Sequence, residues 1–388
     1  MPTLSEESLE LHRRTHGKLE IVSRVPLENT HDMSLAYTPG VAEVCRVIAA
    51  HPDTTAQYTL KGNTIAIISD GSAVLGLGNI GALGAIPVME GKAILFKRFA
   101  DLDAFPICLA TQNTEEIIQA VKAIAPVFGG INLEDIAAPR CFEIEKRLIE
   151  ELDIPVMHDD QHGTAVVVLA GLINALRVAE KSVETVRVVI SGAGAAGTAI
   201  AELLITYGFK KIVVCDSHGA IYTGRDNLNS PKQALARITN PGCVTGEAAL
   251  DCITGGLADA LVGADVFIGV SIAGALTGAM ISRMAQRPII FAMANPLPEI
   301  MPDEARAAGA FIIATGRSDF PNQINNVLAF PGIFRGALDN HVRKITEIML
   351  VNAAKNLAAC VLDPHPELII PPAFDPSVAP AVARAISA

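Results

Sequence analysis

The stretch Val186-Arg-Val-Val-Ile-Ser-Gly192-Ala-Gly-Ala-Ala-Gly197 decides the fold of this chain. Its apolar, β-branched first half predicts a buried strand, and the glycines after it predict a tight turn that opens a helix over Thr198–Tyr207. The first glycine permits the bend, the second lets a pyrophosphate approach the backbone, and the third lets the helix pack closely on the strand. A phosphate would then lie on the helix N-terminus. The stretch therefore predicts a dinucleotide site.

The next apolar run, Ile212–Asp216, ends in an acid that can bond both ribose hydroxyls. Because a carboxylate there disfavours a ribose 2′-phosphate, we expect NAD in preference to NADP. Ser217, His218 and Arg225 lie close by in the sequence and leave NADP possible. The cofactor-binding residues expected from this region are Gly192, Gly194, Ala195, Ala196, Gly197 and Asp216.

Short β-branched runs separated by helical segments continue on both sides of this site. The downstream runs are Val266–Val270, Ile289–Met293 and Phe311–Thr315, and the upstream runs are Ile65–Ser69 and Ile94–Phe96. This alternation is typical of parallel sheets with helices on both faces. We predict an α/β protein with a smaller α/β domain over residues 1–160. A Rossmann-like, doubly wound parallel sheet follows over residues 161–388, and the helix-like run Gly332–Cys360 is expected to pack back onto the first domain.

Two pairs of adjacent acids stand in largely apolar surroundings. Asp159 and Asp160 lie in Pro155-Val-Met-His-Asp-Asp-Gln-His-Gly163, and Glu134 and Asp135 lie upstream. Four carboxylates placed close together repel one another unless a cation or a proton compensates them. An oxygen-rich cluster without cysteine suits Mg²⁺ or Mn²⁺ better than zinc. Solvent-facing helix caps are the alternative interpretation of these acids.

Histidine and cysteine give weaker signals. His158 and His162 have a spacing that fits a helical zinc pair, but the acids between and upstream of them favour an oxygen site, so we expect supporting roles for both. The seven cysteines include no Cys-x-x-Cys pair, and we expect reduced, buried thiols without a chemical role.

Composition excludes several classes of protein. The net charge of −11 argues against general nucleic-acid binding. Val166–Leu176 is too short to cross a membrane, no 18-residue run is expected to do so, and the N-terminus lacks the order of a signal peptide. We expect a cytoplasmic protein of two domains that binds neither nucleic acid nor membrane.

Several motifs together resemble the malic enzyme family, in particular its short bacterial members, from about Arg14 to the early 360s. They are Leu35-Ala-Tyr-Thr-Pro-Gly-Val-Ala42, Ser69–Gly81, Glu90-Gly-Lys92, Gly130–Asp135, His158–Thr164 and Asn325–Gly332. The resemblance implies oxidative decarboxylation of L-malate to pyruvate and CO₂ with NAD(P) and a divalent metal. It also points to a homodimer.

The resemblance also implies roles for individual residues. The implied catalytic residues are Tyr37 as general acid, Lys92 as base on the substrate hydroxyl and Asp159 as the acid that supports the lysine. The implied metal ligands are Glu134, Asp135 and Asp160. The implied substrate ligands are Asn295 and Asn326, with Asn295 also beside the cofactor. A lysine can act as the base if burial or a cationic neighbour lowers its pKa toward neutrality.

One position departs from the larger relatives. They carry a substrate-binding arginine where this chain has Ala73. Another basic residue, supplied by this chain or a neighbouring subunit, would have to bind the carboxylate.

Three alternative functions remain at this point. A malolactic-type enzyme of the same family would retain NAD and release lactate. A redox sensor would bind NAD(H) without catalysis. A metal-independent hydroxyacid dehydrogenase would leave the four acids unexplained.

Overall fold

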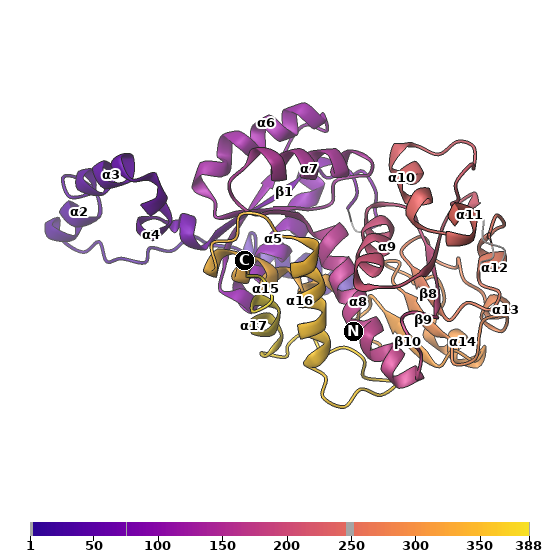
Figure 1. Cartoon of the computed structure of the whole chain (residues 1–388). Coiled ribbons are helices and arrows are strands. Elements are labelled where there is room, and N and C mark those ends of the chain that lie inside the picture. The colour runs from indigo at the N-terminus through magenta and orange to yellow at the C-terminus, as the bar shows by residue number, and fades with distance from the viewer. Residues whose placement is uncertain (1–2, 75, 246–251, 388) are drawn as a thin grey trace.

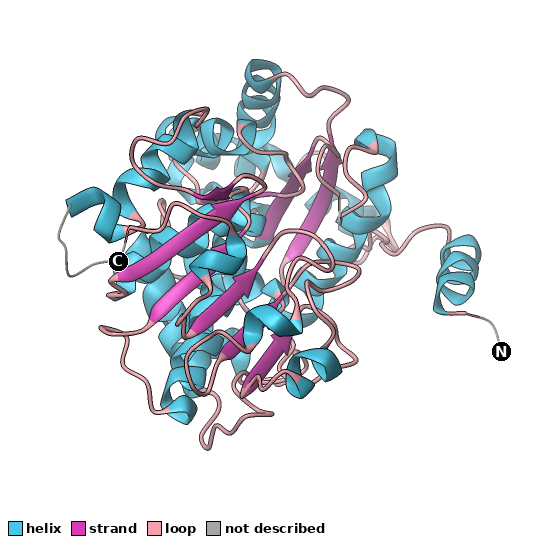
Figure 2. Cartoon of the chain, turned by 90° about the vertical axis from the view of Figure 1, so that its right-hand side faces the viewer, coloured by secondary structure: helices cyan, strands magenta, loops and turns pink. Residues whose placement is uncertain are grey.

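The computed structural model describes residues 3–74, 76–245 and 252–387. Two parallel sheets form the body of the molecule, and helices cover both faces of each (Figures 1 and 2). The prediction of an α/β protein with a doubly wound parallel sheet is confirmed. The domain boundary after residue 160 stays a prediction.

The first sheet has the order β2-β1-β3-β4 and is parallel throughout. Its strands are β1 (Thr64–Ser69), β2 (Asp103–Cys108), β3 (Gly130–Leu133) and β4 (Val156–His158). Side chains of β1 alternate between the two faces: Ile65 and Ile67 join the core that holds α5 (Gly81–Ala100), whereas Ala66 and Ile68 pack with α6 (Thr114–Ile124) and α7 (Arg140–Glu151). Ile94–Phe96, which we predicted as a strand, lies inside α5, so that prediction is wrong.

The second sheet has the order β10-β9-β8-β5-β6-β7, with only β7 antiparallel among the described strands. Its strands are β5 (Arg187–Ser191), β6 (Lys211–Asp216), β7 (Gly219–Ala220), β8 (Val266–Gly269), β9 (Ile289–Ala292) and β10 (Ile312–Thr315). The order of the sheet reverses between β5 and β8, where open α/β sheets bind their ligands. Helix α9 (Ala195–Tyr207) follows β5.

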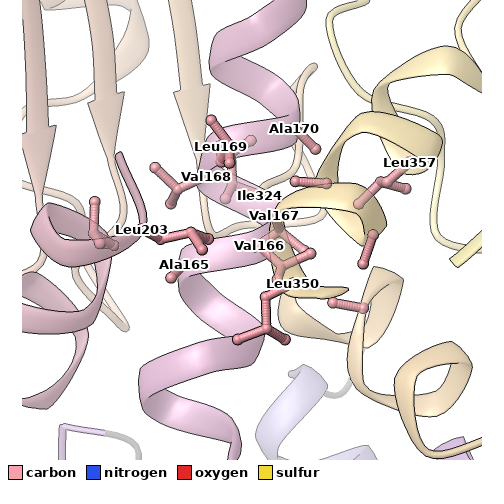
Figure 3. Close-up of a cluster of buried hydrophobic side chains, with 14 of the residues drawn as sticks. Ala165, Val166, Val167, Val168, Leu169, Ala170, Leu203, Ile324, Leu350 and Leu357 are labelled. Carbon is pink, nitrogen blue, oxygen red and sulfur yellow. The ribbon is translucent and has the colours of Figure 1, made fainter. Parts of the chain in front are cut away.

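Helix α8 (Asp159–Ala179) lies between the two sheets and packs against α9 and α16 (Figures 1 and 3). Its apolar side chains Val166–Ala170 interdigitate with Leu203 of α9 and with Leu350 and Leu357 of α16 (Figure 3). Its 21 residues are long and apolar enough to cross a membrane, contrary to our expectation that no such run exists. Burial of most of the helix within the body instead explains this composition.

The C-terminal part of the chain closes over the first sheet. The run Gly332–Cys360 is not one helix, because α15 (Phe330–Asp339) and α16 (Glu347–Ala359) are separate and Thr346 caps the start of α16. The ring of Phe96 in α5 packs between Phe330 and Phe334 of α15 at centroid distances of 4.7 and 5.6 Å.

Shorter helices complete the body. They are η3 (Ala125–Val127), α10 (Ser230–Ile238), α11 (Pro241–Thr245), α12 (Leu257–Ala260), α13 (Gly278–Ile281), α14 (Pro302–Ala307), η4 (Asn326–Leu328) and α17 (Val378–Ala383). The prediction of seven free thiols is wrong, because Cys243 and Cys252 form a disulfide. Cys45 is exposed, which also contradicts the prediction that all the cysteines are buried.

The N-terminal helices precede β1, and all but the last of them lie outside the body. They are α1 (Leu4–Thr15), α2 (Thr30–Ala36), α3 (Val41–Ala50), η1 (Pro52–Thr54), α4 (Thr55–Tyr58) and η2 (Leu60–Asn63). None of these segments contains a buried residue. Helices α2, α3 and α4 project from the body as an arm (Figure 1), and the helix nearest the N-terminus also stands apart (Figure 2).

Candidate active site

A cluster of charged side chains lies at the carboxyl edge of the first sheet. Glu134 directly follows β3 and Asp159 directly follows β4. Because parallel strands end at the same edge, the chain brings both acids together despite their separation in sequence. The cluster is thus built at the ends of β3 and β4, two short buried strands that are each followed directly by an acid.

Lys92 is the centre of this cluster. It projects from α5 and is only 6% exposed. Its Nζ donates to Glu134 Oε1 at 2.8 Å and to Asp159 Oδ2, and it lies 4.2 Å from the centroid of the Phe330 ring. The ammonium group therefore has two anionic partners and an aromatic face around it.

Burial disfavours the charged forms of the side chains in this cluster. At Lys92, however, the effect of the neighbouring acids on the pKa is larger than that of burial. Burial alone would lower the pKa of Lys92; the carboxylates of Asp159, Glu134 and Asp160 instead raise it above its usual value. Burial raises the pKa of Asp159 to about 8 and also raises the pKa of Glu134, against the opposing effect of Lys92. The condition under which a lysine acts as a base, a lowered pKa, is therefore not met by Lys92 in these surroundings. One ammonium group does not compensate the acids around it.

The three acids predicted as metal ligands lie together. Oxygen atoms of Glu134, Asp135 and Asp160 are all within 4.8 Å of one another. Asp135 has a left-handed backbone with φ +55°, and its N–H donates to Asp160 Oδ2 at 2.8 Å. An all-oxygen donor set beside an excess of buried negative charge fits a hard divalent cation. The residues therefore fit the group, while their role as ligands stays a prediction.

The two histidines lie behind this set. His158 is fully buried, and burial lowers the pKa of its imidazole to about 4, so that it is neutral. His162 Nε2 lies 3.1 Å from Glu145 Oε2. The supporting roles of both histidines stay a prediction.

Glu145 of α7 holds the start of α8, and the sequence argument missed it. Its buried carboxylate accepts the backbone N–H of His158 at 2.7 Å and Nε2 of Gln161 at 2.9 Å. Burial opposes its ionisation, but His162 and His158 keep its pKa below the usual value. No local motif marks this residue, since the helix that carries it is amphipathic and rich in glutamate.

The two predicted asparagines of the second half of the chain lie in different places. Asn326, at the start of η4, donates through Nδ2 to Asp159 Oδ2 and so joins the cluster. Asn295 lies in the exposed loop after β9. Its backbone carbonyl oxygen lies close to Gly76, and a Cβ on Gly76 would be only 2.5 Å from that oxygen. The buried carboxylate of Glu299 fixes this loop by accepting the N–H of Ala294 at 3.0 Å. Sequence reasoning missed Glu299 as well.

The glycine turn after β5 has the shape that the sequence predicts. Gly192 has φ +118°, and a Cβ there would be 2.5 Å from the carbonyl oxygen of Val270. A Cβ on Gly197 would meet the Gly192 carbonyl at 1.8 Å, whereas one on Gly194 would meet open space. The turn lies next to the point where the sheet order reverses, with Ala195 and Ala196 opening α9. Binding of a pyrophosphate here stays a prediction.

The carboxylate of Asp216, at the end of β6, accepts hydrogen bonds from three groups of this chain. Its Oδ2 accepts from Arg225 Nη2 at 2.5 Å and Lys232 Nζ at 2.7 Å, and its Oδ1 accepts the N–H of His218 at 2.9 Å. Burial opposes ionisation, yet these donors hold the pKa of Asp216 well below its usual value. Because two cations neutralise the carboxylate, it repels a 2′-phosphate less than the sequence argument assumed. Lys232 comes from α10 and was missed.

Tyr37 is not brought to the cluster within one chain. It is the residue at the C-terminal cap of α2 in the projecting arm, and it is 70% exposed (Figure 1). Ala73 does lie near the acids, since its N–H donates to the carbonyl of Asp135 at 3.0 Å. Arg140, a nearby cation, donates to the buried Asp70 at 2.7 Å and to Ser72 Oγ at 3.1 Å.

Comparison with known proteins adds independent information. The family model described as Malic enzyme, NAD binding domain, matches residues 161–387, and that described as Malic enzyme, N-terminal domain, matches residues 16–116 and 110–149. The chain is 56% identical over 388 residues to the bifunctional malic/malolactic enzyme of Bacillus subtilis, covering 99% of this chain and 92% of that protein. It is 55% identical over 372 residues to the NAD-dependent malic enzyme of Geobacillus stearothermophilus, covering 95% and 76% of the two proteins. The crystal structure of the NAD-dependent malic enzyme of Thermotoga maritima matches with a TM-score of 0.92 and 52% identity, covering 98% of both chains.

Proposed function

Because the chain belongs to the malic enzyme family, we propose that the cluster around Lys92 catalyses the oxidative decarboxylation of L-malate to pyruvate and CO₂, with reduction of NAD(P). The observation that carries this proposal is the position of Lys92 between Glu134 and Asp159, beside the three-acid set that fits a divalent cation. A catalytically silent NAD(H) sensor has no need of this buried arrangement. A metal-independent dehydrogenase would leave the three-acid set without a purpose.

Lys92 is the group that we assign to the first proton transfer. The proton of the malate hydroxyl passes to Nζ of Lys92 while the C2 hydride passes to the nicotinamide. Asp159, which contacts both Lys92 and Asn326, orients the amine and exchanges the proton with it. The C3–C4 bond then breaks, CO₂ leaves, and the electron pair stays on the three-carbon enolate. Tyr37 donates a proton to C3 to give pyruvate.

Glu134, Asp135 and Asp160 are the residues that would hold Mg²⁺ or Mn²⁺. When bound, the cation supplies Lewis-acid polarisation of the substrate oxygens. A cation held by these residues would also offset the carboxylates that raise the pKa of Lys92, and would so favour the free amine needed in a base.

The remaining assignments concern the cofactor and the assembly. We assign the glycine turn at Gly192–Gly197 to the pyrophosphate and Asp216 to the adenosine ribose, with NAD as the preferred cofactor. Asn295 and Asn326 are assigned to substrate, with Asn295 also beside the nicotinamide. A cytoplasmic homodimer and a domain boundary after residue 160 complete the proposal.

The relative from Bacillus subtilis gives a reason to test a second activity. Its name includes malolactic conversion, and the two chains are 56% identical. In that reaction the nicotinamide would return its hydride to the three-carbon product and lactate would leave. The two activities differ in whether reduced cofactor accumulates.

A direct assay tests the proposal. Purified protein is incubated with L-malate, NAD and Mn²⁺ while NADH absorbance, pyruvate and lactate are followed. We expect equal amounts of NADH and pyruvate, loss of turnover after chelation, and recovery with Mn²⁺ or Mg²⁺. Full turnover in metal-free protein would contradict the metal assignment, and lactate without NADH would make malolactic conversion the principal activity.

A further inference from the structure

The N-terminal arm, defined as residues 28–60, leaves the body at the edge of the first sheet opposite to the candidate site. It leads into η2 and then into the amino end of β1, whereas Glu134 and Asp159 follow the carboxyl ends of β3 and β4. Since β1 has six residues, the two edges are about 20 Å apart. The arm therefore starts on the wrong side of the sheet to place Tyr37 beside Lys92 of the same chain.

Both ends of the arm are fixed to the body. Before it, Arg24 forms an ion pair with Asp103 at the start of β2. After it, the ammonium of Lys61 donates to the carbonyl of Phe128 at 2.7 Å and to that of Pro126 at 3.1 Å. Two anchors on the amino side of the sheet oppose a swing of the arm around to its own site.

The arm lacks a core of its own. Helices α2, α3 and α4 have 7, 10 and 4 residues and contain no buried side chain. Isolated helices shorter than about 12–15 residues are marginal in water, and a helix in a protein is stabilised mainly by packing of its apolar face. Met33, Leu35 and Tyr37 are each at least half exposed. The arm as folded therefore requires a surface from outside this chain.

The body exposes apolar side chains at the edge where the site lies. Leu77, Ile80 and Leu83 belong to the segment that follows the carboxyl end of β1 and begins α5, the helix of Lys92. Leu77 is 67% exposed and Leu83 is 82% exposed. Removing such side chains from water stabilises an assembly that covers them.

A second copy of this chain can cover the exposed apolar side chains of the arm and those at the start of α5 at the same time. The two tyrosines of the body do not replace Tyr37. The ring of Tyr207 packs with Phe209 at the end of α9, and its centroid is 5.6 Å from the Lys355 ammonium. Tyr222 follows β7 at the edge of the second sheet, whereas the site lies on the first sheet. We propose that two copies exchange arms around a two-fold axis, so that Tyr37 of each chain completes the site containing Lys92 of the partner subunit. Each site is then incomplete in a single chain. This inference rests on the role proposed above for Tyr37 as the acid.

Paired heterodimers test the exchange. Chains with two different affinity tags are produced together, and dimers carrying both tags are isolated. In a dimer of Tyr37→Phe with Lys92→Ala, exchange leaves one site with both residues intact, so about half of the wild-type kcat is expected. In a dimer of wild type with the Tyr37→Phe/Lys92→Ala double variant, exchange leaves no intact site, and activity falls to the level of the single-variant homodimers.

The opposite pattern, activity only in the second heterodimer, would overturn the exchange. Failure of co-produced chains to form any mixed dimer would overturn it too. If the Tyr37→Phe homodimer turned over like wild type, the acid role assigned under the proposed function would fail first. The two failures are therefore distinguishable.

A surface variant tests the packing without touching catalytic groups. Leu35→Asp places a charge on α2, and we expect it to convert the dimer to monomer in size-exclusion chromatography, with far-UV circular dichroism of the body preserved and turnover lost. Leu362→Asp is the matched control, because Leu362 is 90% exposed in the loop after α16. It should remain an active dimer. A fully active, dimeric Leu35→Asp protein would contradict the proposal.

Discussion

The cluster around Lys92 and the arm that carries Tyr37 contrast sharply, although the proposed reaction uses both. Lys92 is 6% exposed and has Glu134 and Asp159 as direct partners, while Tyr37 is 70% exposed at the end of a seven-residue helix. Strand ends of one sheet position the first, whereas the second belongs to a helix without a buried residue. Under the proposed roles, the group for oxidation is positioned within one chain, whereas the group for the final proton transfer is positioned only by assembly with a second copy.

The largest effect is expected at the lysine. Lys92→Ala removes the proposed base, and general acid–base contributions of about 10²–10⁴-fold predict a comparable loss of kcat for malate oxidation. Lys97→Ala is the control on the same helix, because Lys97 is half exposed and pairs with Asp101 and Asp103. A small amine added to the Lys92→Ala protein should restore part of the rate. Wild-type turnover without Lys92 would remove the cluster from the chemistry.

Stability should separate the body from the arm. Phe96→Ala opens a cavity between α5 and α15, and we expect the free energy of unfolding to fall by about 3–5 kcal/mol at any protein concentration. Leu35→Ala in the arm should destabilise more strongly on dilution, because in our proposal a second copy supplies the packing of Leu35. Thermal unfolding at two protein concentrations measures both effects. An equal, concentration-independent loss for Leu35→Ala would indicate packing within one chain.

Metal affinity should depend on the body alone. Glu134→Gln removes one anionic oxygen from the three-acid set, and even outer partners of metal ligands contribute about 10–100-fold to affinity, so we expect Mn²⁺ binding to weaken by at least about 100-fold. Titration calorimetry with Mn²⁺ measures this without turnover. The control is Glu150→Gln, an exposed acid of α7. Unchanged Mn²⁺ binding by Glu134→Gln would count against the assigned ligand.

The smallest effect concerns cofactor choice. Asp216→Ala releases Arg225 and Lys232 from their shared carboxylate, so both become available to a ribose 2′-phosphate. The ratio of kcat/KM for NADP to that for NAD should rise at least about tenfold, equivalent to about 1.4 kcal/mol. Asp226→Ala, at an exposed position, should leave the ratio unchanged. A wild-type preference for NADP would show that the two cations already dominate.

Sequence reasoning succeeded where the signal is local. The strand, glycine turn and helix around Gly192 follow from neighbouring residues, and the structure has them in that form. The run Ile94–Phe96 misled, because a short apolar run does not distinguish a buried helix from a strand by periodicity. Lys232 and Glu145 could not be found, since each meets its partner only after a helix folds back.

The arm marks the other limit of the sequence. The motif around Tyr37 shows which residue type is present, but it carries no information about which copy of the chain receives it. Neither could the sequence give the raised pKa of Lys92, because that depends on three carboxylates delivered by different strands.

Pre-steady-state measurement of NADH and pyruvate in the wild type, Tyr37→Phe and Lys92→Ala proteins tests the division of labour most directly. If the body carries out oxidation and the arm supplies the last proton, Tyr37→Phe should form about one NADH per site in a rapid burst, followed by slow release of pyruvate. Lys92→Ala should show no burst. A burst in Lys92→Ala as large and as fast as that expected for Tyr37→Phe, or the complete absence of a burst in Tyr37→Phe, would contradict the account.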